Sequence, residues 1–329
     1  MVMLRRIAVL AWTLAAGSVQ GLDADVEQWL VQMDHAMASI SYRGTLVSTG
    51  PHRIDSLRVL HRIDGQGGVR ERIYALDGPR REVLRDGARV RCLISGQTSL
   101  IVDNPIPTRL LARVPLADIL ESSPVYQAEI GGVDRVAGRD ARIIEIRPLD
   151  RYRYGRTLWL DSDTGMLLRS GVFDPEGGVV EQLSFVEIEI GAMIEDFELE
   201  SELDNAADFA RYTIPGRDGE VALSGSRPEW IPDKLPRGFR LVSVGSGSPA
   251  NPFEHLLFSD GLSNFSIYIE SGEQAVLAEH VEVRGATHIY TGRVKDRVVT
   301  VVGEVPAATV QLVGHHFLVL QHPALRHLE

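Results

Sequence analysis

The feature that most restricts the fold of this chain is a series of short runs in which apolar and charged residues alternate. The clearest runs lie at 57–63, 89–94 and 186–190. A period of two places the apolar side chains on one face of a β-strand and the charged side chains on the other. Turn residues such as Asp86-Gly87 separate the runs. The pattern therefore predicts an antiparallel meander with one apolar face.

A helix is predicted before this meander. Five apolar residues recur there at the spacing of one helix face: Val26, Trp29, Leu30, Met33 and Met37. Asp25 with Gln28 resembles a capping box at the start of the helix. Between 104 and 127, four prolines interrupt the meander, and leucine and isoleucine residues indicate short helical turns. Because a sheet with one wet face must bury the other, we expect the helix and this insertion to cover it.

The second half of the chain indicates a second, smaller domain. Residues 174–208 hold twelve acids and neither Lys nor Arg, and the stretch from 211 to 228 is rich in Gly, Ser and Pro. We place a linker at 205–228, between a half-barrel domain at 22–204 and a small mixed α/β domain at 229–329. The expected fold class is α+β, mainly β, with an N-terminal unclosed antiparallel β-barrel covered by helices.

Strands of the second domain are predicted from their apolar and β-branched runs. These runs lie at 240–244, 255–259, 265–270, 288–293 and 297–302. A last helix is expected to begin at Pro306, because proline is favoured at the first helical position.

The first 21 residues have the pattern of a secretory signal peptide. Arg5 and Arg6 precede an apolar stretch from 7 to 16, and small and polar residues follow. The apolar stretch is about half of the ~20 residues that a spanning helix needs. We expect cleavage after Ser18 or Gly21 and a soluble, exported protein.

Composition and motifs exclude several function classes. The formal charge of −11 repels phosphate backbones, so nucleic acid is not an expected partner. A single cysteine, Cys92, permits neither an intrachain disulfide nor a multi-cysteine metal site, and its apolar strand face favours a buried small hydrophobe. Residues 245–250 loosely match a dinucleotide fingerprint, but Pro249 and Pro252 indicate a loop instead. We therefore expect no enzyme activity, cofactor or metal.

Arginine is concentrated in the first strands. Between 43 and 91 there are eleven arginines and six acids. A solvated outer sheet face has this composition. So does an anion-binding surface, which could face either an external ligand or the chain's own acidic connector, the second half of the acid-rich stretch at 174–208. On the apolar face, His61 is expected to be a hydrogen-bonded core residue.

Several segments resemble a known family, the RseB/MucB type of periplasmic regulators of envelope-stress sigma factors. The matching segments are Tyr42-Arg43-Gly44, residues 76–83 (Leu-Asp-Gly-Pro-Arg-Arg-Glu-Val), 150–155 (Asp-Arg-Tyr-Arg-Tyr-Gly) with Leu158-Trp159-Leu160, 258–262 (Phe-Ser-Asp-Gly-Leu) and 299–306 (Val-Thr-Val-Val-Gly-Glu-Val-Pro). The resemblance implies a first domain similar to the lipoprotein carriers of the periplasm. It also implies a non-enzyme that binds the periplasmic segment of a transmembrane anti-sigma factor, shields it from proteolysis, and releases it on sensing lipopolysaccharide or another acylated molecule.

The candidate binding residues follow from residue chemistry. For an acyl chain we expect the apolar set Ile106, Leu110, Leu111, Leu116, Ile119, Leu120 and Trp159. For anions or a partner we expect the arginines Arg80, Arg81, Arg85, Arg151 and Arg153. A periplasmic lipid or lipoprotein carrier is the alternative function. The sequence leaves open whether the protein forms a homo-oligomer.

Overall fold

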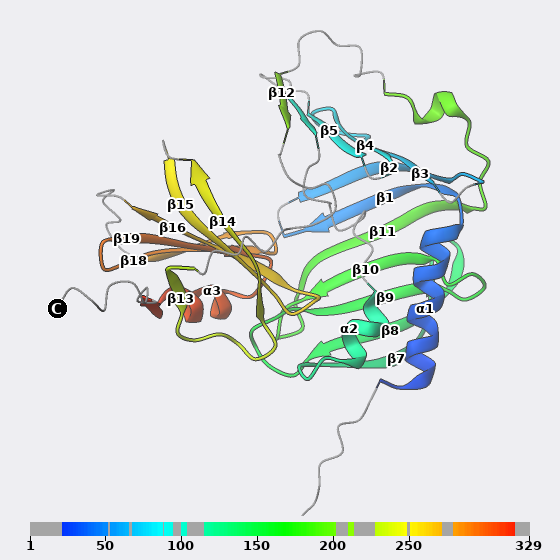
Figure 1. Cartoon of the computed structure of the whole chain (residues 1–329). Coiled ribbons are helices and arrows are strands. Elements are labelled where there is room, and N and C mark those ends of the chain that lie inside the picture. Colours follow the sequence, from blue (N-terminus) through cyan, green and yellow to red (C-terminus); the bar gives the residue numbers. More distant parts are fainter. Residues whose placement is uncertain are drawn as a thin grey trace, which may run out of the picture.

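The computed structural model describes residues 22–51, 53–65, 68–87, 89–94, 100–103, 115–201, 210–213, 228–248, 251–271 and 279–319. It shows a 12-stranded sheet, a 6-stranded sheet and a 2-stranded sheet (Figure 1). The expected signal peptide at 1–21 lies outside the described residues. None of the helices in the described ranges is both long enough and apolar enough to cross a bilayer.

The first sheet is unclosed and, apart from one pair at its edge, antiparallel, as the alternating pattern predicts. Its strands are β1 (Tyr42–Gly50), β2 (Arg53–Ile63), β3 (Val69–Ala75), β4 (Arg81–Asp86), β5 (Arg89–Ile94), β6 (Leu100–Asp103), β7 (Tyr126–Val136), β8 (Arg139–Pro148), β9 (Gly155–Asp161), β10 (Leu167–Phe173), β11 (Val179–Ile190) and β12 (Ala210–Thr213). Their order is β12-β6-β5-β4-β3-β2-β1-β11-β10-β9-β8-β7. The sheet therefore has two edges, β12 and β7, and the barrel is not closed.

β12 differs from the sequence prediction. It lies inside the region expected as a linker and pairs with β6 in parallel, with Ala210 opposite Leu100. The pairing satisfies backbone groups that an edge strand would otherwise leave open.

α1 (Ala24–Ser39) crosses one face of the first sheet (Figure 1). Its residues Val26 and Leu30 pack against β8 and β9 in one core cluster, together with α2 (Leu116–Glu121). The capping box expected at Asp25 is wrong. The cap is Asp23, whose side chain accepts a hydrogen bond from the Asp25 backbone N–H at 2.9 Å, because Asp25 already has helical geometry.

The second domain contains the six-stranded sheet. Its strands are β14 (Arg240–Ser248), β15 (Asn251–Ser259), β16 (Asn264–Ser271), β17 (His280–Arg284), β18 (Thr287–Val294) and β19 (Arg297–Gly303), in the order β14-β15-β16-β19-β18-β17. The five predicted strands are all present. β17, β13 (Trp230–Pro232) and β20 (Phe317–Val319) are short and carry too little pattern to be predicted.

α3 (Ala307–Gly314) closes the core of this domain. Pro306 caps it rather than occupying its first turn. Val310 and Val313 of α3 are completely buried with Phe258 and Phe265 in a core separate from that of the first sheet.

Candidate functional site

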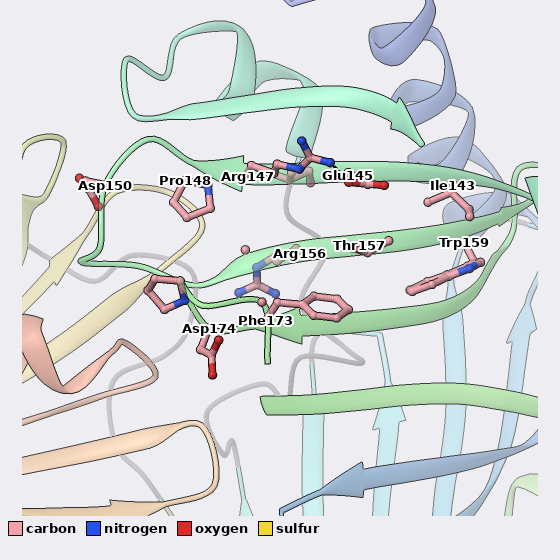
Figure 2. Close-up of a pocket in the computed structure, with 14 residues that line it drawn as sticks. Ile143, Glu145, Arg147, Pro148, Asp150, Arg156, Thr157, Trp159, Phe173 and Asp174 are labelled. Atoms are coloured by element: carbon pink, nitrogen blue, oxygen red, sulfur yellow. Dashed lines mark hydrogen bonds and ion pairs between the residues drawn. The ribbon is translucent and has the colours of Figure 1, made fainter. Parts of the chain in front are cut away.

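A groove with a cavity volume of about 530 Å³ lies on β8, β9 and β10. Figure 2 shows Ile143, Trp159 and Phe173 projecting from these three strands toward one side. Leu158 and Leu160, which alternate with Trp159 along β9, pack against α1. Because alternate residues of a strand point to opposite faces, the groove lies on the face turned away from α1.

The aromatic floor of the groove is held in place by its neighbours. Trp159 Nε1 donates to Asp134 Oδ2 at 2.9 Å, and the Arg169 guanidinium lies 5.0 Å from the centre of the indole ring. A Cβ at Gly171 would come within 2.7 Å of Phe173, so glycine makes room for that ring. Trp159 is 9% exposed, and the floor is therefore a fixed apolar surface rather than a loose side-chain cluster.

Charged residues form the rim of the groove. Arg147 pairs with Glu129 at 2.7 Å and with Glu145, and the hydrogen bond to Glu145 raises the pKa of Arg147 above its ordinary value. Asp150 and Asp174 line the end that lies away from Trp159, and Arg156 lies between that end and Trp159, beside Phe173 (Figure 2). An apolar floor with a charged end suits an amphiphile, with its chain on the rings and its head group at the rim.

A polar joint at this end of the groove connects the two domains. Arg153, in the turn between β8 and β9, is 0% exposed. Its Nε donates to Asp260 Oδ2 of the second domain at 2.8 Å, its Nη2 donates to the Arg237 carbonyl at 2.7 Å, and its Nη1 donates to Asp150 at 2.5 Å. All three nitrogens of the guanidinium therefore have partners, two of them in the other domain.

Asp260 is bonded from both sides. Its Oδ2 also accepts from the Tyr126 hydroxyl at 3.0 Å, and its Oδ1 accepts from the backbone N–H groups of Leu262 and Ser263 at 3.0 and 2.7 Å. Burial, and then the Asp260 charge, raise the pKa of Tyr126 well above its usual value, so this hydroxyl stays a donor. The carboxylate thus has four donors around it and tolerates complete burial.

Three of the segments that carried the family resemblance meet at this joint. In 150–155, the Tyr152 carbonyl accepts from Thr309 Oγ1 at 2.5 Å, and the Tyr154 hydroxyl donates to the Ala286 carbonyl at 3.2 Å. Asp260 belongs to 258–262. In 299–306, the Val305 carbonyl lies 2.8 Å from Nδ1 of the His288 imidazole, which also contacts Tyr154. The motifs therefore describe an interface between domains.

The arginine-rich outer face of β1–β5 faces the chain's own acidic segment, here called the acidic strap (residues 191–201). Asp196 accepts from Arg62 at 2.6 Å and from Arg70 at 2.7 Å, and the hydrogen bond from Arg62 lowers the pKa of Asp196. Glu198 accepts from Arg43 at 3.1 Å. The sequence left open whether this surface faces solvent, an external ligand or the chain's own acids. These arginines bind the chain's own acids.

Apolar contacts also hold the acidic strap. Ile194 and Leu199 are buried with Leu60 of β2. Beneath the strap, Glu82 accepts from Arg72 at 2.5 Å and from the Ser201 hydroxyl. The start of the connector toward the second domain is thereby fixed to the first sheet.

The inner face of β1–β5 contains two residues singled out from sequence. His61 is buried, its ring is stacked on Tyr42, and its Nδ1 lies 3.4 Å from Glu71 Oε1, as expected for a core histidine. Cys92 is half-buried opposite Val83, and burial raises its thiol pKa, which is the opposite of what an activated nucleophile needs.

The apolar residues predicted to bind an acyl chain do not form one site, as far as the structure describes them. Ile106, Leu110 and Leu111 lie outside the described residues. Leu116 and Leu120 pack in the core with α1, and Ile119 lies against Gly261 of the second domain. Trp159 lies in the groove on the opposite face of the sheet. Alternation along β9 separates Trp159 from α2, so Trp159 cannot line a common trough with Leu116, Ile119 and Leu120.

The predicted anion-binding arginines also separate. Arg80 is exposed, Arg81 donates to Asp55 at 2.7 Å, and Arg85 Nε donates to the Gly87 carbonyl at 3.0 Å. Arg151 is exposed, with its guanidinium 5.5 Å from the Tyr152 ring centre. Arg153 is enclosed in the joint, and its guanidinium is not available to an external anion in this arrangement.

Sequence reasoning missed the residues that complete the groove and the joint. Ile143 and Phe173 read as ordinary apolar strand residues, and Tyr126 carried no motif. Asp260-Gly261 lies within the matching segment 258–262, and an acid in a turn between two predicted strands was the one sequence feature that pointed to its role. Within the described residues, no group of three or more His, Cys, Asp or Glu side chains could hold a metal ion.

Comparison with known proteins identifies the family. The model of the MucB/RseB N-terminal domain matches residues 25–203, and the model of the MucB/RseB C-terminal domain matches residues 224–317. The chain belongs to the MucB/RseB family. The resemblance seen in the five segments is thereby confirmed, and the family consists of regulatory binding proteins rather than enzymes.

Relatives in this family align along most of the chain. The sigma factor AlgU regulatory protein MucB of Pseudomonas aeruginosa is 33% identical over 299 residues, which are 88% of this chain and 90% of MucB. The sigma-E factor regulatory protein RseB of Escherichia coli is 25% identical over 293 residues, which are 87% of this chain and 88% of RseB.

Solved structures of MucB are also similar to this chain in their three-dimensional fold. The Pseudomonas aeruginosa MucA/MucB complex gives a TM-score of 0.71 at 29% identity and covers 91% of this chain and 100% of that chain. A crystal structure of MucB gives a TM-score of 0.60 at 28% identity and covers 91% of this chain and 99% of that one. The two-domain fold is thus similar to that of MucB.

Proposed function

We propose that this protein is a periplasmic negative regulator of an envelope-stress sigma factor, which binds the periplasmic segment of a transmembrane anti-sigma factor and protects it from proteolysis. The observation that carries the proposal is the similarity of both domains, in one arrangement, to MucB in its complex with MucA, at a TM-score of 0.71. The export signal expected at 1–21 supports the periplasmic location, where such a segment is accessible.

The second part of the proposal is that an acylated ligand such as lipopolysaccharide promotes release. The groove offers an apolar floor at Ile143, Trp159 and Phe173. At about 0.8 kcal/mol per buried methylene, a ~12-carbon chain has on the order of 9 kcal/mol of gross hydrophobic free energy available. Among the arginines predicted to bind anions, Arg80 and Arg151 are exposed and stay candidates for anionic head groups, whereas Arg81 and Arg85 have internal partners.

The test uses the mature protein and the purified periplasmic segment of the anti-sigma factor from the same organism. We expect complex formation by calorimetry, and slower cleavage of the segment by its site-specific protease when the protein is present. Added lipopolysaccharide should restore cleavage. No complex with the segment contradicts the regulatory function, whereas protection that lipopolysaccharide leaves unchanged contradicts only the release step.

The carrier alternative makes a different prediction with the same material. A carrier would be recovered from periplasm with lipoproteins or lipids and without a stable protein client. Recovery of the anti-sigma segment as the main bound protein favours regulation, and recovery of lipoproteins in its place favours transport.

A further inference from the structure

The groove and the domain joint share two residues. Asp150 lines the groove and is also the partner of Arg153 Nη1 at 2.5 Å. Arg156 lines the groove and donates from Nη2 to the Leu262 carbonyl of the second domain at 3.1 Å. In Figure 2 Asp150 lies at the end of the groove opposite Ile143 and Trp159, and Arg156 lies between them.

Arg153 connects Asp150 with the second domain. Because its guanidinium is planar and its donors are fixed relative to one another, a shift of Asp150 at Nη1 also changes the geometry at Nε and Nη2. Those two nitrogens hold Asp260 and the Arg237 carbonyl. A change at the groove rim therefore reaches both contacts that Arg153 makes across the joint.

Close backbone contact makes the joint an all-or-none arrangement. A Cβ at Gly261 would lie 2.9 Å from Ile119, and a Cβ at Gly238 would lie 3.2 Å from Val125. Glycine lets the second domain approach α2 and the start of β7 without intervening atoms. Packed surfaces of this kind switch between discrete arrangements rather than opening by degrees.

We propose that an anionic amphiphile bound in the groove loosens the domain joint. Its chain lies on the aromatic floor, and its head group attracts the Arg156 guanidinium away from the Leu262 carbonyl and repels the Asp150 carboxylate that holds Arg153. Ligand binding and joint opening are then linked by the higher affinity of the ligand for the open joint. This inference rests on the proposed function, and it adds the route by which a lipid signal reaches the second domain.

Hydrogen–deuterium exchange of the mature protein tests the route, with purified lipopolysaccharide as the probe. The readout is the exchange rate of the Leu262 and Ser263 amides, which both donate to Asp260. With lipopolysaccharide, the wild-type amides should exchange about tenfold faster. A lysine cannot donate to Asp150, Asp260 and the Arg237 carbonyl with the fixed geometry of a guanidinium. In the variant Arg153→Lys the two amides should therefore exchange fast without lipid. An exposed arginine outside the groove and the joint provides the control, since Arg284→Lys, which keeps the charge that pairs with Glu282, should behave as wild type.

Each result decides the inference. If the wild type binds lipopolysaccharide and the two amides keep their slow exchange, the coupling is wrong while the proposed function stands. If lipopolysaccharide does not bind, the lipid part of the proposed function fails and the coupling fails with it. If the Leu262 and Ser263 amides of a folded Arg153→Lys variant exchange slowly without lipid, Arg153 does not connect the groove with the second domain. Circular dichroism checks the fold, and Asp150→Asn serves as a milder variant if Arg153→Lys is unfolded.

Discussion

Arg153 of the first domain donates from Nε to the Asp260 carboxylate of the second domain at 2.8 Å, and both side chains are completely removed from solvent. A buried ion pair is tolerated only when its remaining donors and acceptors also have partners. Asp150 and the Arg237 carbonyl fulfil this condition for Arg153, and Tyr126 with two backbone amides fulfils it for Asp260. The pair therefore fixes the relative position of the two sheets.

Asp260→Asn should destabilise the protein through this pair. The amide could still accept from the backbone of Leu262 and Ser263, but its NH₂ group would then face two donors, Arg153 Nε and the Tyr126 hydroxyl. We expect the free energy of unfolding to fall by about 3 kcal/mol, measured by denaturant titration. Arg284→Gln, which removes an exposed pair with Glu282, is the control and should change little. Equal effects of the two variants would contradict the assigned importance of the joint.

Gly261→Ala should also weaken the joint, for two separable reasons. Gly261 has φ +100°, which L-residues rarely adopt, and a Cβ there would lie 2.9 Å from Ile119. Gly285→Ala is a matched control because Gly285 has φ +61° with nothing within 4 Å of its Cβ. We expect a loss of about 2–3 kcal/mol at Gly261 and about 1 kcal/mol at Gly285, by thermal unfolding. In the Ile119→Ala background the difference between the two should shrink.

Asp34 of α1 should make stability depend on pH. Burial, and then the charge of Asp118 on α2, raise its pKa from 3.8 to about 6. The folded state therefore holds a proton between about pH 4 and 6 that the unfolded state has lost, and stability from this group falls as pH rises through that window. Asp34→Asn should abolish this fall and gain about 1 kcal/mol at pH 7, after allowance for solvent screening of a half-buried group. The measurement is the free energy of unfolding of wild type and variant by denaturant titration at several pH values. If the two plots against pH run parallel between pH 4 and 6, the raised pKa of Asp34 is contradicted.

Trp159 should report on ligand binding in the groove. Lipopolysaccharide is expected to shift the tryptophan fluorescence of the wild type, and Trp159→Phe should abolish that shift. Trp230→Phe is the control, because Trp230 is buried in the core of the second domain. Trp159→Ala should weaken lipid binding about tenfold, since it removes much of the apolar floor. A shift that persists in Trp159→Phe would locate the ligand elsewhere.

Local patterns in the sequence predicted the elements well. Period-two alternation indicated the meander that β1–β5 form, and the 3.6-residue spacing of Val26, Leu30 and Met33 indicated α1. Both periods follow from the geometry of a single helix or strand, so they are visible without knowledge of any distant residue. The five matching segments likewise indicated the family from short stretches alone.

The roles of individual side chains in the groove and joint depended on tertiary structure. Arg153 and Asp260 are 107 positions apart in the chain, and no local pattern indicates that two turns from different domains will meet. The same limit applied to Trp159, because alternation shows which residues share a face of β9 and leaves open which face α1 covers. For Arg62 and Arg70 the sequence left open whether they face solvent, an external ligand or the chain's own acids, and only the fold places the acidic strap on them. By itself, the sequence determined the strands, the first helix and the family, because their signals are local. Only the fold decided which charges and rings meet, because burial and pairing are properties of residues brought together over long distances in the chain.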